Sequence, residues 1–423
     1  MIVLIGSFLV LLLLKTPVSF SMFVSSILYL LTYDIPVLVA VQRMASGPDS
    51  FPLLAVPGFI LAGTIMNTSG ITERLFNFAN KCVGHITGGL GHANIFASII
   101  FAGMSGTAIA DAAGMGAVEL KAMKDRGFDE DFSLAVTGAS SIVGPIIPPS
   151  VPAVLYGVVA SVSIGRLFAA GFIPGVLMGC ALSVLVFIQA KKRGYPKELR
   201  PTVKEFSLAF KDAFFPLLTP VLIIGGILIG VFTPTEAAFI TVIYSIVLGI
   251  SYQSIRVRDL LVFVRETANT TVSVMLIVAS SAVFAWILAS EQIPQKLAEV
   301  FLVAFPNKYV ALVVINLFLL IAGSFMETIA AITILTPVLL PVVLELGVDP
   351  VHFGILMILN LMIGLLTPPI GMVLYVLSTV SQVPFEKIAK AVVPYLLLLI
   401  GVLYVLTFLP DVVLWLPNLI FNK

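Results

Sequence analysis

Long apolar runs separated by short polar loops dominate the sequence. A run of about 20 mostly apolar residues is long enough to cross the hydrocarbon core of a bilayer as one α-helix. The pattern therefore predicts an all-α, polytopic membrane protein. The predicted spans lie near residues 2–14, 18–40, 52–67, 132–160, 167–190, 214–232, 236–253, 267–289, 352–380 and 391–409.

Two further apolar segments, 92–120 and 310–345, fit a single span poorly. The first has small residues at its centre, over 103–107, which an ordinary lipid-facing helix does not need. We expect each segment to form a re-entrant hairpin whose two arms enter and leave on the same side of the membrane. Such hairpins are tolerated where the tip is buried in protein or lines a cavity. The second tip is expected over 323–328.

Glycines and prolines recur at a constant separation of 220 positions. These residues mark where the backbone departs from a helix, so the duplicated feature is a pattern of helix breaks inside apolar sequence. In a membrane protein, duplicated breaks indicate a transporter. Matching positions include Gly103 and Gly323, Gly127 and Gly347, Asp129 and Asp349, Gly144 and Gly364, Pro148-Pro149 and Pro368-Pro369, Ala169 and Ala389, and Pro174 and Pro394.

This duplication divides the chain into five parts. Two repeats, 51–190 and 267–410, each hold one hairpin and one discontinuous helix. The discontinuous helices are expected at 132–160 and 352–380. The other three parts are N-terminal scaffold helices at 1–50, a cytoplasmic linker with a surface helix and two connecting helices at 191–266, and a C-terminal tail at 411–423.

Basic residues set the predicted orientation. The loop with Lys191, Lys192 and Arg193 is the most basic, the loop with Arg256 and Arg258 follows, and both should be cytoplasmic. Counting spans from these loops places the opening of the first hairpin on the cytoplasmic side and that of the second on the opposite side. The repeats are therefore predicted to be inverted, as in secondary transporters that bind their substrate at the membrane midplane.

Three amphipathic segments complete this picture. Segments 71–83 and 293–305 precede the two hairpins, and either connect a moving domain to a fixed one or rest in the membrane interface. Segment 201–214 has apolar residues on one face and is expected to be a cytoplasmic surface helix or a contact for a partner subunit. Its apolar residues are Val203, Phe206, Phe210 and Phe214.

The helix breaks, at 144–152 and 364–371, are the expected position of the chemistry. Prolines remove backbone donors and free carbonyl oxygens one turn earlier. Together with hydroxyls at the hairpin tips, these oxygens predict two cages for Na⁺, while half-helix amino ends favour an anionic substrate group. The alternative is that the prolines only kink packed helices, but the duplication favours ion sites. The predicted cation-binding residues are Ser105, Gly106, Thr107, Gly144, Ile147, Pro149, Thr328, Gly364, Thr367 and Pro369, with substrate near the tips at Ser105 and Met326.

Three carboxylates lie in apolar surroundings. Asp111, four residues past Thr107, is predicted to act in ion binding or in the geometry of the tip. Glu327 at the second tip either caps a helix or acts directly in coupling. Glu236 follows Thr233 in a capping-box pattern, so starting a helix is its expected role.

Composition excludes several other classes of protein. The chain is 59% hydrophobic and 11% charged with a net charge of +1, which gives no reason to expect nucleic acid as a partner. The two cysteines and three histidines lack disulfide or metal-ligand spacing. Neither a Ser-His-Asp order nor a phosphate-binding glycine loop is present, so neither an enzyme nor an ATPase is expected, and no cofactor besides Na⁺ as coupling ion.

Four segments resemble signatures of one known family. They are DSFPLLAVP at 49–57, FAGMSGTAIADAAG at 101–114, IPPS at 147–150 and GVFTPTEAA at 230–238. The sequence resembles, over nearly its whole length, the large membrane subunit of tripartite ATP-independent periplasmic (TRAP) transporters, which belong to the ion-transporter superfamily. Carried onto this chain, the tips of the family's hairpins correspond to 105–107 and 326–328.

The resemblance implies an elevator-type transporter in the bacterial inner membrane, driven by a Na⁺ gradient. It also implies two partners, a small four-helix membrane subunit on a separate chain and a soluble periplasmic binding protein that delivers an organic acid. Sialic acid is the expected cargo, slightly ahead of a C4-dicarboxylate. The alternatives are an anion symporter that needs no soluble partner, and a gated channel.

Overall fold

The computed structural model describes residues 2–256 and 258–421, apart from the side chains of residues 102–105. All regular secondary structure in these residues is helical. Eight helices are long and apolar enough to cross a membrane, or nine spans if the bent pair 130–146 and 151–159 counts as one span. The helices are α1 (Ile2–Leu13), α2 (Val18–Thr32), α3 (Leu38–Ser46), α4 (Ala55–Thr68), α5 (Ile71–Val83), α6 (Gly89–Ser105), α7 (Ala108–Ala113), α8 (Met115–Asp125), α9 (Glu130–Ser141), α10 (Val151–Val159), α11 (Ile164–Arg193), α12 (Val203–Leu228), α13 (Pro234–Ser251), α14 (Asp259–Ser290), α15 (Ile293–Ala304), α16 (Lys308–Phe325), α17 (Thr328–Glu345), α18 (Pro350–Gly364), α19 (Met372–Ser381), α20 (Phe385–Phe408) and α21 (Pro410–Phe421), with short 3₁₀ helices η1 (Phe51–Leu54) and η2 (Gly144–Ile146).

The two inverted repeats have the same order of elements. In the first, α6 and the pair α7–α8 form the hairpin and α9, η2 and α10 form the discontinuous helix; in the second, these parts are α16 with α17, and α18 with α19. Gly127 and Gly347 both have positive φ, at 75° and 67°. Both Pro-Pro bonds within the breaks are cis. The predicted hairpins, discontinuous helices and duplicated breaks are thus confirmed.

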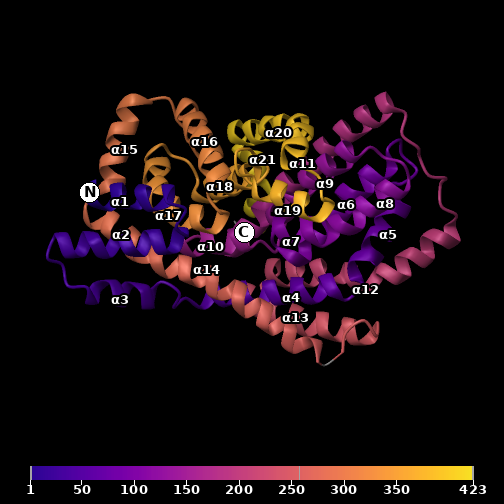
Figure 1. Cartoon of the computed structure of the whole chain (residues 1–423), viewed down its shortest axis with the longest axis horizontal. Coiled ribbons are helices and arrows are strands. Elements are labelled where there is room, and N and C mark those ends of the chain that lie inside the picture. The colour runs from indigo at the N-terminus through magenta and orange to yellow at the C-terminus, as the bar shows by residue number, and fades with distance from the viewer. Residues whose placement is uncertain (1, 257, 422–423) are drawn as a thin grey trace.

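Two helices connect the hairpins to the remaining helices. Helix α5 joins α4 to the first hairpin, and α15 joins α14 to the second. They lie near opposite ends of the long axis of the molecule (Figure 1). Each begins after a residue with left-handed backbone, Gly70 at φ 67° and Gln292 at φ 56°, so the chain turns sharply at both positions.

The scaffold is built around the long helix α14, which contacts α2, α3, α4 and α17. Helix α4 packs closely on α13, because a β-carbon placed on Gly58 would lie 2.8 Å from the Ala238 side chain. The capping box predicted at the start of α13 is confirmed: the Thr233 amide donates to the Glu236 carboxylate over 2.7 Å, and the Glu236 amide donates back to the Thr233 hydroxyl over 3.3 Å.

Buried amide side chains join each hairpin to its own discontinuous helix. In the first repeat, the Ser140 hydroxyl donates to Asn94 Oδ1 over 2.6 Å, and in the second, Asn360 Nδ2 donates to Asn316 Oδ1 over 2.9 Å. Positions 140 and 360 are again separated by 220 residues. A buried polar pair of this kind is costly to separate, so each hairpin arm is fixed against the helix beside it.

A polar cluster joins the start of α9 to the end of α11. The Tyr195 hydroxyl and the Arg193 guanidinium both donate to the Asp129 carboxylate, the latter over 2.9 Å, and Arg193 also pairs with Asp131 over 3.0 Å. The hydrogen bond from Tyr195, followed by that from Arg193, lowers the pKa of Asp129. Asp129 therefore stays ionised at neutral pH, and the loop between α8 and α9 is tied to the end of α11.

Three segments have helix boundaries that differ from those predicted. The run 18–40 is two helices, because Pro36 disfavours helix at the residue before it and Asp34 adopts a φ of 51°. The predicted surface helix and the following span form one helix, α12, which continues through Pro216 and Pro220. The C-terminal segment, expected as a tail, forms α21 and packs against α11.

The apolar face predicted at the start of α12 has a partner within this chain. The Phe78 ring on α5 lies 6.0 Å from that of Phe206 and 5.9 Å from that of Phe210, measured between ring centroids. The helix therefore covers α5, one of the two helices that connect to a hairpin.

The glycines at 323 and 364, identified from the repeat, contact each other. A β-carbon on Gly364 would lie 2.5 Å from the carbonyl carbon of Gly323, and one on Gly323 would lie 3.1 Å from the Leu361 Cα. The hairpin arm α16 and helix α18 therefore meet backbone to backbone. Gly364 is the last residue of α18, so its role in the structure is to permit close packing.

We expect Gly364→Ala to destabilise the protein by about 1–3 kcal/mol, because the added methyl group overlaps main-chain atoms that cannot move independently. Thermal unfolding of the purified protein measures this as a lower melting temperature. Gly401→Ala is the matched control, since it lies within α20 and nothing is within 4 Å of its added β-carbon. Equal melting temperatures for the two variants would contradict the packing role.

Candidate functional site

The first hairpin tip combines a left-handed glycine with a helix cap. Gly106 has φ 64°, and Thr107 is extended and begins α7, its hydroxyl accepting a hydrogen bond from the Ala110 amide over 3.3 Å. Ser105 ends α6, and its side chain, predicted to bind a cation, lies outside the described residues. The backbone leaves the helix for two residues at this tip.

The break in the first discontinuous helix lies directly behind this tip. After η2 the chain is extended at Ile147 and resumes a helix at Ser150, whose hydroxyl donates to the Pro145 carbonyl and accepts from the Ala153 amide. A β-carbon on Gly106 would lie 3.2 Å from the Pro149 carbonyl oxygen. Among the described residues, the Ile147 and Pro149 carbonyls accept no hydrogen bond.

The second tip is capped by a carboxylate. Met326 is extended, and Glu327 begins α17 and accepts hydrogen bonds from the Ile329 amide over 2.9 Å and the Ala330 amide over 3.2 Å. Capping, one of the two predicted roles of Glu327, is thus confirmed. The next residue, Thr328, is 4% exposed, and its hydroxyl has no hydrogen-bond partner within the described part of the chain.

The break in the second discontinuous helix is more open than the first. The Thr367 amide donates to the Gly364 carbonyl over 2.9 Å, and its hydroxyl donates to the Ile363 carbonyl over 2.8 Å. The following residues 368–370 are exposed, whereas all residues from 142 to 150 are buried. The two breaks thus share their sequence pattern but differ in their surroundings.

The two tips meet at one small cavity. It has a volume of about 50 Å³ and is lined from the first repeat by Thr107, Pro145 and Val151, and from the second by Glu327 and Thr328, among others. Both tips and the first break therefore converge, as the repeat pattern predicts. Met326, predicted to lie near the substrate, is not among the lining residues.

A larger cavity of about 440 Å³ separates the tips from the scaffold. Thr107 and Glu327 line it on the hairpin side. The scaffold side adds polar groups from α4 and α14, which the sequence analysis did not identify because single Thr, Ser and Asn residues in apolar helices carry no pattern. These residues are Thr64, Asn67, Thr270 and Ser273.

Asn67 also holds the scaffold against the first hairpin. Its Nδ2 donates to the Ala110 carbonyl over 3.5 Å, and a β-carbon on Gly114 would lie 2.3 Å from its Oδ1. Gly114 separates α7 from α8, and the Asn67 side chain lies against it at the kink between these two helices. The close approach requires glycine at this position.

Asp111 does not line either cavity. It is 1% exposed on the inner face of α7, and neither carboxylate oxygen has a hydrogen-bond partner among the residues described. A second buried carboxylate, Glu119 on α8, lies close enough for the charge of Asp111 to act on it. The sequence analysis missed Glu119 because its polar neighbours resemble those of a surface helix.

The comparisons with known proteins agree with this architecture. Residues 5–412 match the family of the DctM component of the tripartite ATP-independent periplasmic transporter. The chain is 49% identical over 405 residues to the sialic acid TRAP transporter large permease protein SiaM of Vibrio cholerae, with 95% of each chain covered. It is 42% identical over 414 residues to the sialic acid TRAP transporter permease protein SiaT of Haemophilus influenzae, which covers 97% of this chain and 67% of that relative.

A solved structure supports the fold. The YdaH transporter of Alcanivorax borkumensis has a TM-score of 0.64 against this chain and covers 88% of it and 87% of its own length, at 15% sequence identity. The resemblance stated from the sequence motifs is confirmed by the family match and by the two relatives. This chain belongs to the DctM family, the large permease subunits of tripartite ATP-independent periplasmic transporters.

Proposed function

We propose that this chain forms the translocation path of a Na⁺-driven transporter for an organic acid, in the bacterial inner membrane. The observation that carries the proposal is the convergence of two hairpin tips and the first helix break at one cavity. Paired discontinuous helices of this kind place substrate and coupling ions near the midplane in secondary transporters. The chain acts as a transporter subunit rather than as an enzyme.

The first Na⁺ cage lies between the first tip and the first break. Na⁺ is a hard cation and prefers oxygen ligands, which carbonyl and hydroxyl groups supply without added charge. The Pro149 carbonyl, which accepts no hydrogen bond among the described residues, lies behind Gly106. We assign the Ile147 carbonyl, Thr107, Gly144 and the Ser105 hydroxyl to the same cage.

The second cage lies between the second tip and the second break. The buried, unpartnered Thr328 hydroxyl supports it from the tip. We assign Thr367, Pro369 and the Gly364 carbonyl to it from the break, where the Gly364 carbonyl keeps one lone pair beside its hydrogen bond to Thr367.

The substrate occupies the larger cavity between the tips and the scaffold. Its volume of about 440 Å³ suits a small organic acid, and Thr107 and the scaffold hydroxyls can donate hydrogen bonds to a carboxylate or a sugar hydroxyl. We infer that the cargo is sialic acid, because both relatives compared above are named for it. A C4-dicarboxylate is the second candidate.

We infer an elevator movement, in which the two repeats carry the cavity past the scaffold helices α4 and α14. Helices α5 and α15 connect these parts, and each starts at a sharp turn. A small four-helix membrane subunit and a periplasmic binding protein complete the transporter. The Haemophilus relative extends beyond the matched region, which leaves room in that protein for a fused small subunit.

Uptake of labelled sialic acid into proteoliposomes tests the whole proposal. The vesicles contain this chain with its small partner, and we expect uptake only when a Na⁺ gradient and the purified binding protein are both present. Uptake of a C4-dicarboxylate with its own binding protein would change the cargo and keep the mechanism. Uptake without any binding protein would refute the tripartite mechanism, and linear, non-saturating flux would indicate a channel.

Gly106→Ala tests the first cage. A residue other than glycine at this φ costs about 1–3 kcal/mol, and the new methyl group also approaches the Pro149 carbonyl. We therefore expect the Na⁺ concentration for half-maximal uptake to rise about tenfold.

Gly230→Ala is the matched control for this variant. Gly230 has a φ of 76°, and nothing lies within 4 Å of an added β-carbon. The control variant carries the same backbone strain away from the cage, so its Na⁺ dependence should equal that of the wild type. An equal shift in both variants would show that strain alone, and no nearby ion site, causes the effect.

Substitutions of Glu327 separate capping from coupling. Glu327→Ala removes the acceptor for two amides, which costs about 1 kcal/mol and should speed hydrogen exchange at Ile329 and Ala330 roughly fivefold. Glu327→Gln keeps an oxygen acceptor, so exchange and Na⁺-driven uptake should both stay close to wild type. Loss of uptake in Glu327→Gln with unchanged exchange would mean that the carboxylate charge itself acts in coupling.

A further inference from the structure

The first hairpin contains two buried carboxylates that form no ion pair with any described residue. Asp111 on α7 and Glu119 on α8 are each 1% exposed. Both oxygens of Asp111 and Oε1 of Glu119 lack a hydrogen-bond partner among the described residues. Burying an isolated carboxylate costs far more than a hydrogen bond returns, so such groups are normally paired, bound to a cation or protonated.

A third oxygen points to the same place from the other arm of the hairpin. Ser98 on α6 is 1% exposed, and its hydroxyl also has no well-aligned hydrogen-bond partner within the described part of the chain. The Ser98 hydroxyl lies close enough to the Asp111 carboxylate to interact with it. Helices α6, α7 and α8 pack against one another, so each contributes one oxygen-bearing side chain to the cluster.

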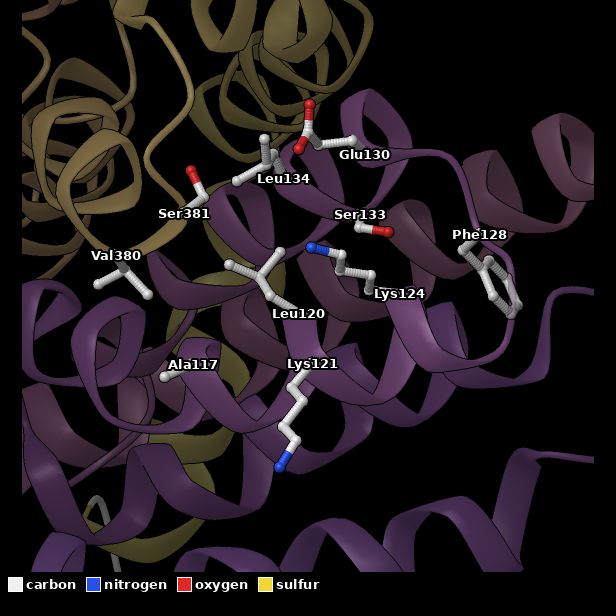
Figure 2. A pocket seen from close by; sticks show the side chains of 10 residues that line it. All are labelled: Ala117, Leu120, Lys121, Lys124, Phe128, Glu130, Ser133, Leu134, Val380 and Ser381. Atoms are coloured by element: carbon white, nitrogen blue, oxygen red, sulfur yellow. The ribbon is translucent and has the colours of Figure 1, made fainter.

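The lysines on α8 do not neutralise these charges. Lys121 and Lys124 lie on the opposite face of the helix from Glu119, because positions two and five residues apart project in nearly opposite directions. They line a separate cavity of about 350 Å³ together with Leu120, and Figure 2 shows the Lys121 amine directed away from its centre.

No charged group on the helices packed around the cluster forms an ion pair with it among the described residues. Helices α5, α6, α9 and α19 contact α7 or α8. No ion pair among the described residues includes Asp111 or Glu119. On these helices Arg74 pairs with Asp212, Glu130 pairs with Lys387, and Asp131 pairs with Arg193. The Tyr375 ring stacks on Phe385. Among the described residues, Glu73, Lys81 and His92 form no ion pair with Asp111 or Glu119.

We propose that Asp111, Glu119 and Ser98 form a Na⁺ site inside the first hairpin, separate from the cages at the tips. Carboxylate and hydroxyl oxygens are hard ligands, and a bound cation removes the repulsion between the two carboxylates. The choice of Na⁺ rests on the proposed function, whereas the need to neutralise the cluster, by a cation or by protons, rests on the two buried carboxylates alone.

The position of this site links it to transport. Asp111 lies on the inner face of α7, while Ile109, Ala110 and Ala113 on the same short helix line the cavity beside the scaffold. A cation that holds α7 against α6 and α8 therefore fixes one wall of that cavity.

Infrared difference spectroscopy of the purified chain with its small partner tests the site without any transport measurement. The spectra compare NaCl with choline chloride and with CaCl₂ at equal ionic strength. We expect Na⁺ to shift carboxylate stretching bands in the wild type, and this shift to be absent in Asp111→Asn and in Glu119→Gln. Asp125→Asn, an exposed position at the end of α8, should retain it.

Two outcomes would overturn the site. The first is an identical response to Na⁺ in the wild type and in both variants. The second is a different occupant of the site. A protonated-carboxyl band that is lost in the variants but insensitive to Na⁺ would indicate a proton, and a response to Ca²⁺ alone would indicate a calcium site. Because the neutral substitutions preserve shape, melting curves in choline chloride should show folded variants.

The result is distinguishable from that of the uptake experiment. Band shifts that depend on Asp111 and Glu119, combined with uptake that needs no Na⁺ gradient, would keep this site and remove Na⁺ as the driving ion. Uptake that needs Na⁺, without such band shifts, would keep Na⁺ as the driving ion and remove this site.

Discussion

The structure depends on one constraint: a backbone that leaves the helix inside a membrane domain must find its hydrogen bonds within the protein. The chain meets this demand at four places. Thr107 and Glu327 cap the helices after the two tips, Ser150 bonds both ends of the first break, and Thr367 bonds the end of α18. Carbonyls left over beside these caps, such as that of Pro149, are therefore held in place with a free lone pair.

The same pattern of breaks has different consequences in the two repeats. Residues 142–150 are buried among the other helices, whereas residues 368–370 are exposed. Of the two cages proposed above, the second is therefore the less enclosed in this conformation. An asymmetry between related repeats is what alternating access requires, because two inverted repeats in identical surroundings would open equally to both sides.

The sequence predicted the hairpins, the discontinuous helices and the capping box of Glu236, because glycine, proline and capping residues act locally and their spacing of 220 is visible in the chain. It did not predict contacts that depend on tertiary packing. The continuity of α12 through Pro216 and the role of Asn67 each depend on neighbours far along the chain. The fold and both tips could thus be predicted, whereas the scaffold side of the cavity could not.

Glu119 shows most clearly where prediction from sequence ends. Its neighbours Lys121, Lys124 and Asp125 suggest a solvated helix, yet the helix turns this one carboxylate inward toward Asp111. When both carboxylates are ionised, their charges repel and favour separation of α7 and α8. A cation bound between them favours the packed hairpin, and it can do so only because its oxygen ligands come together in that state. In the proposed site, cation binding and the geometry of the hairpin are therefore one equilibrium, and the two carboxylates link them.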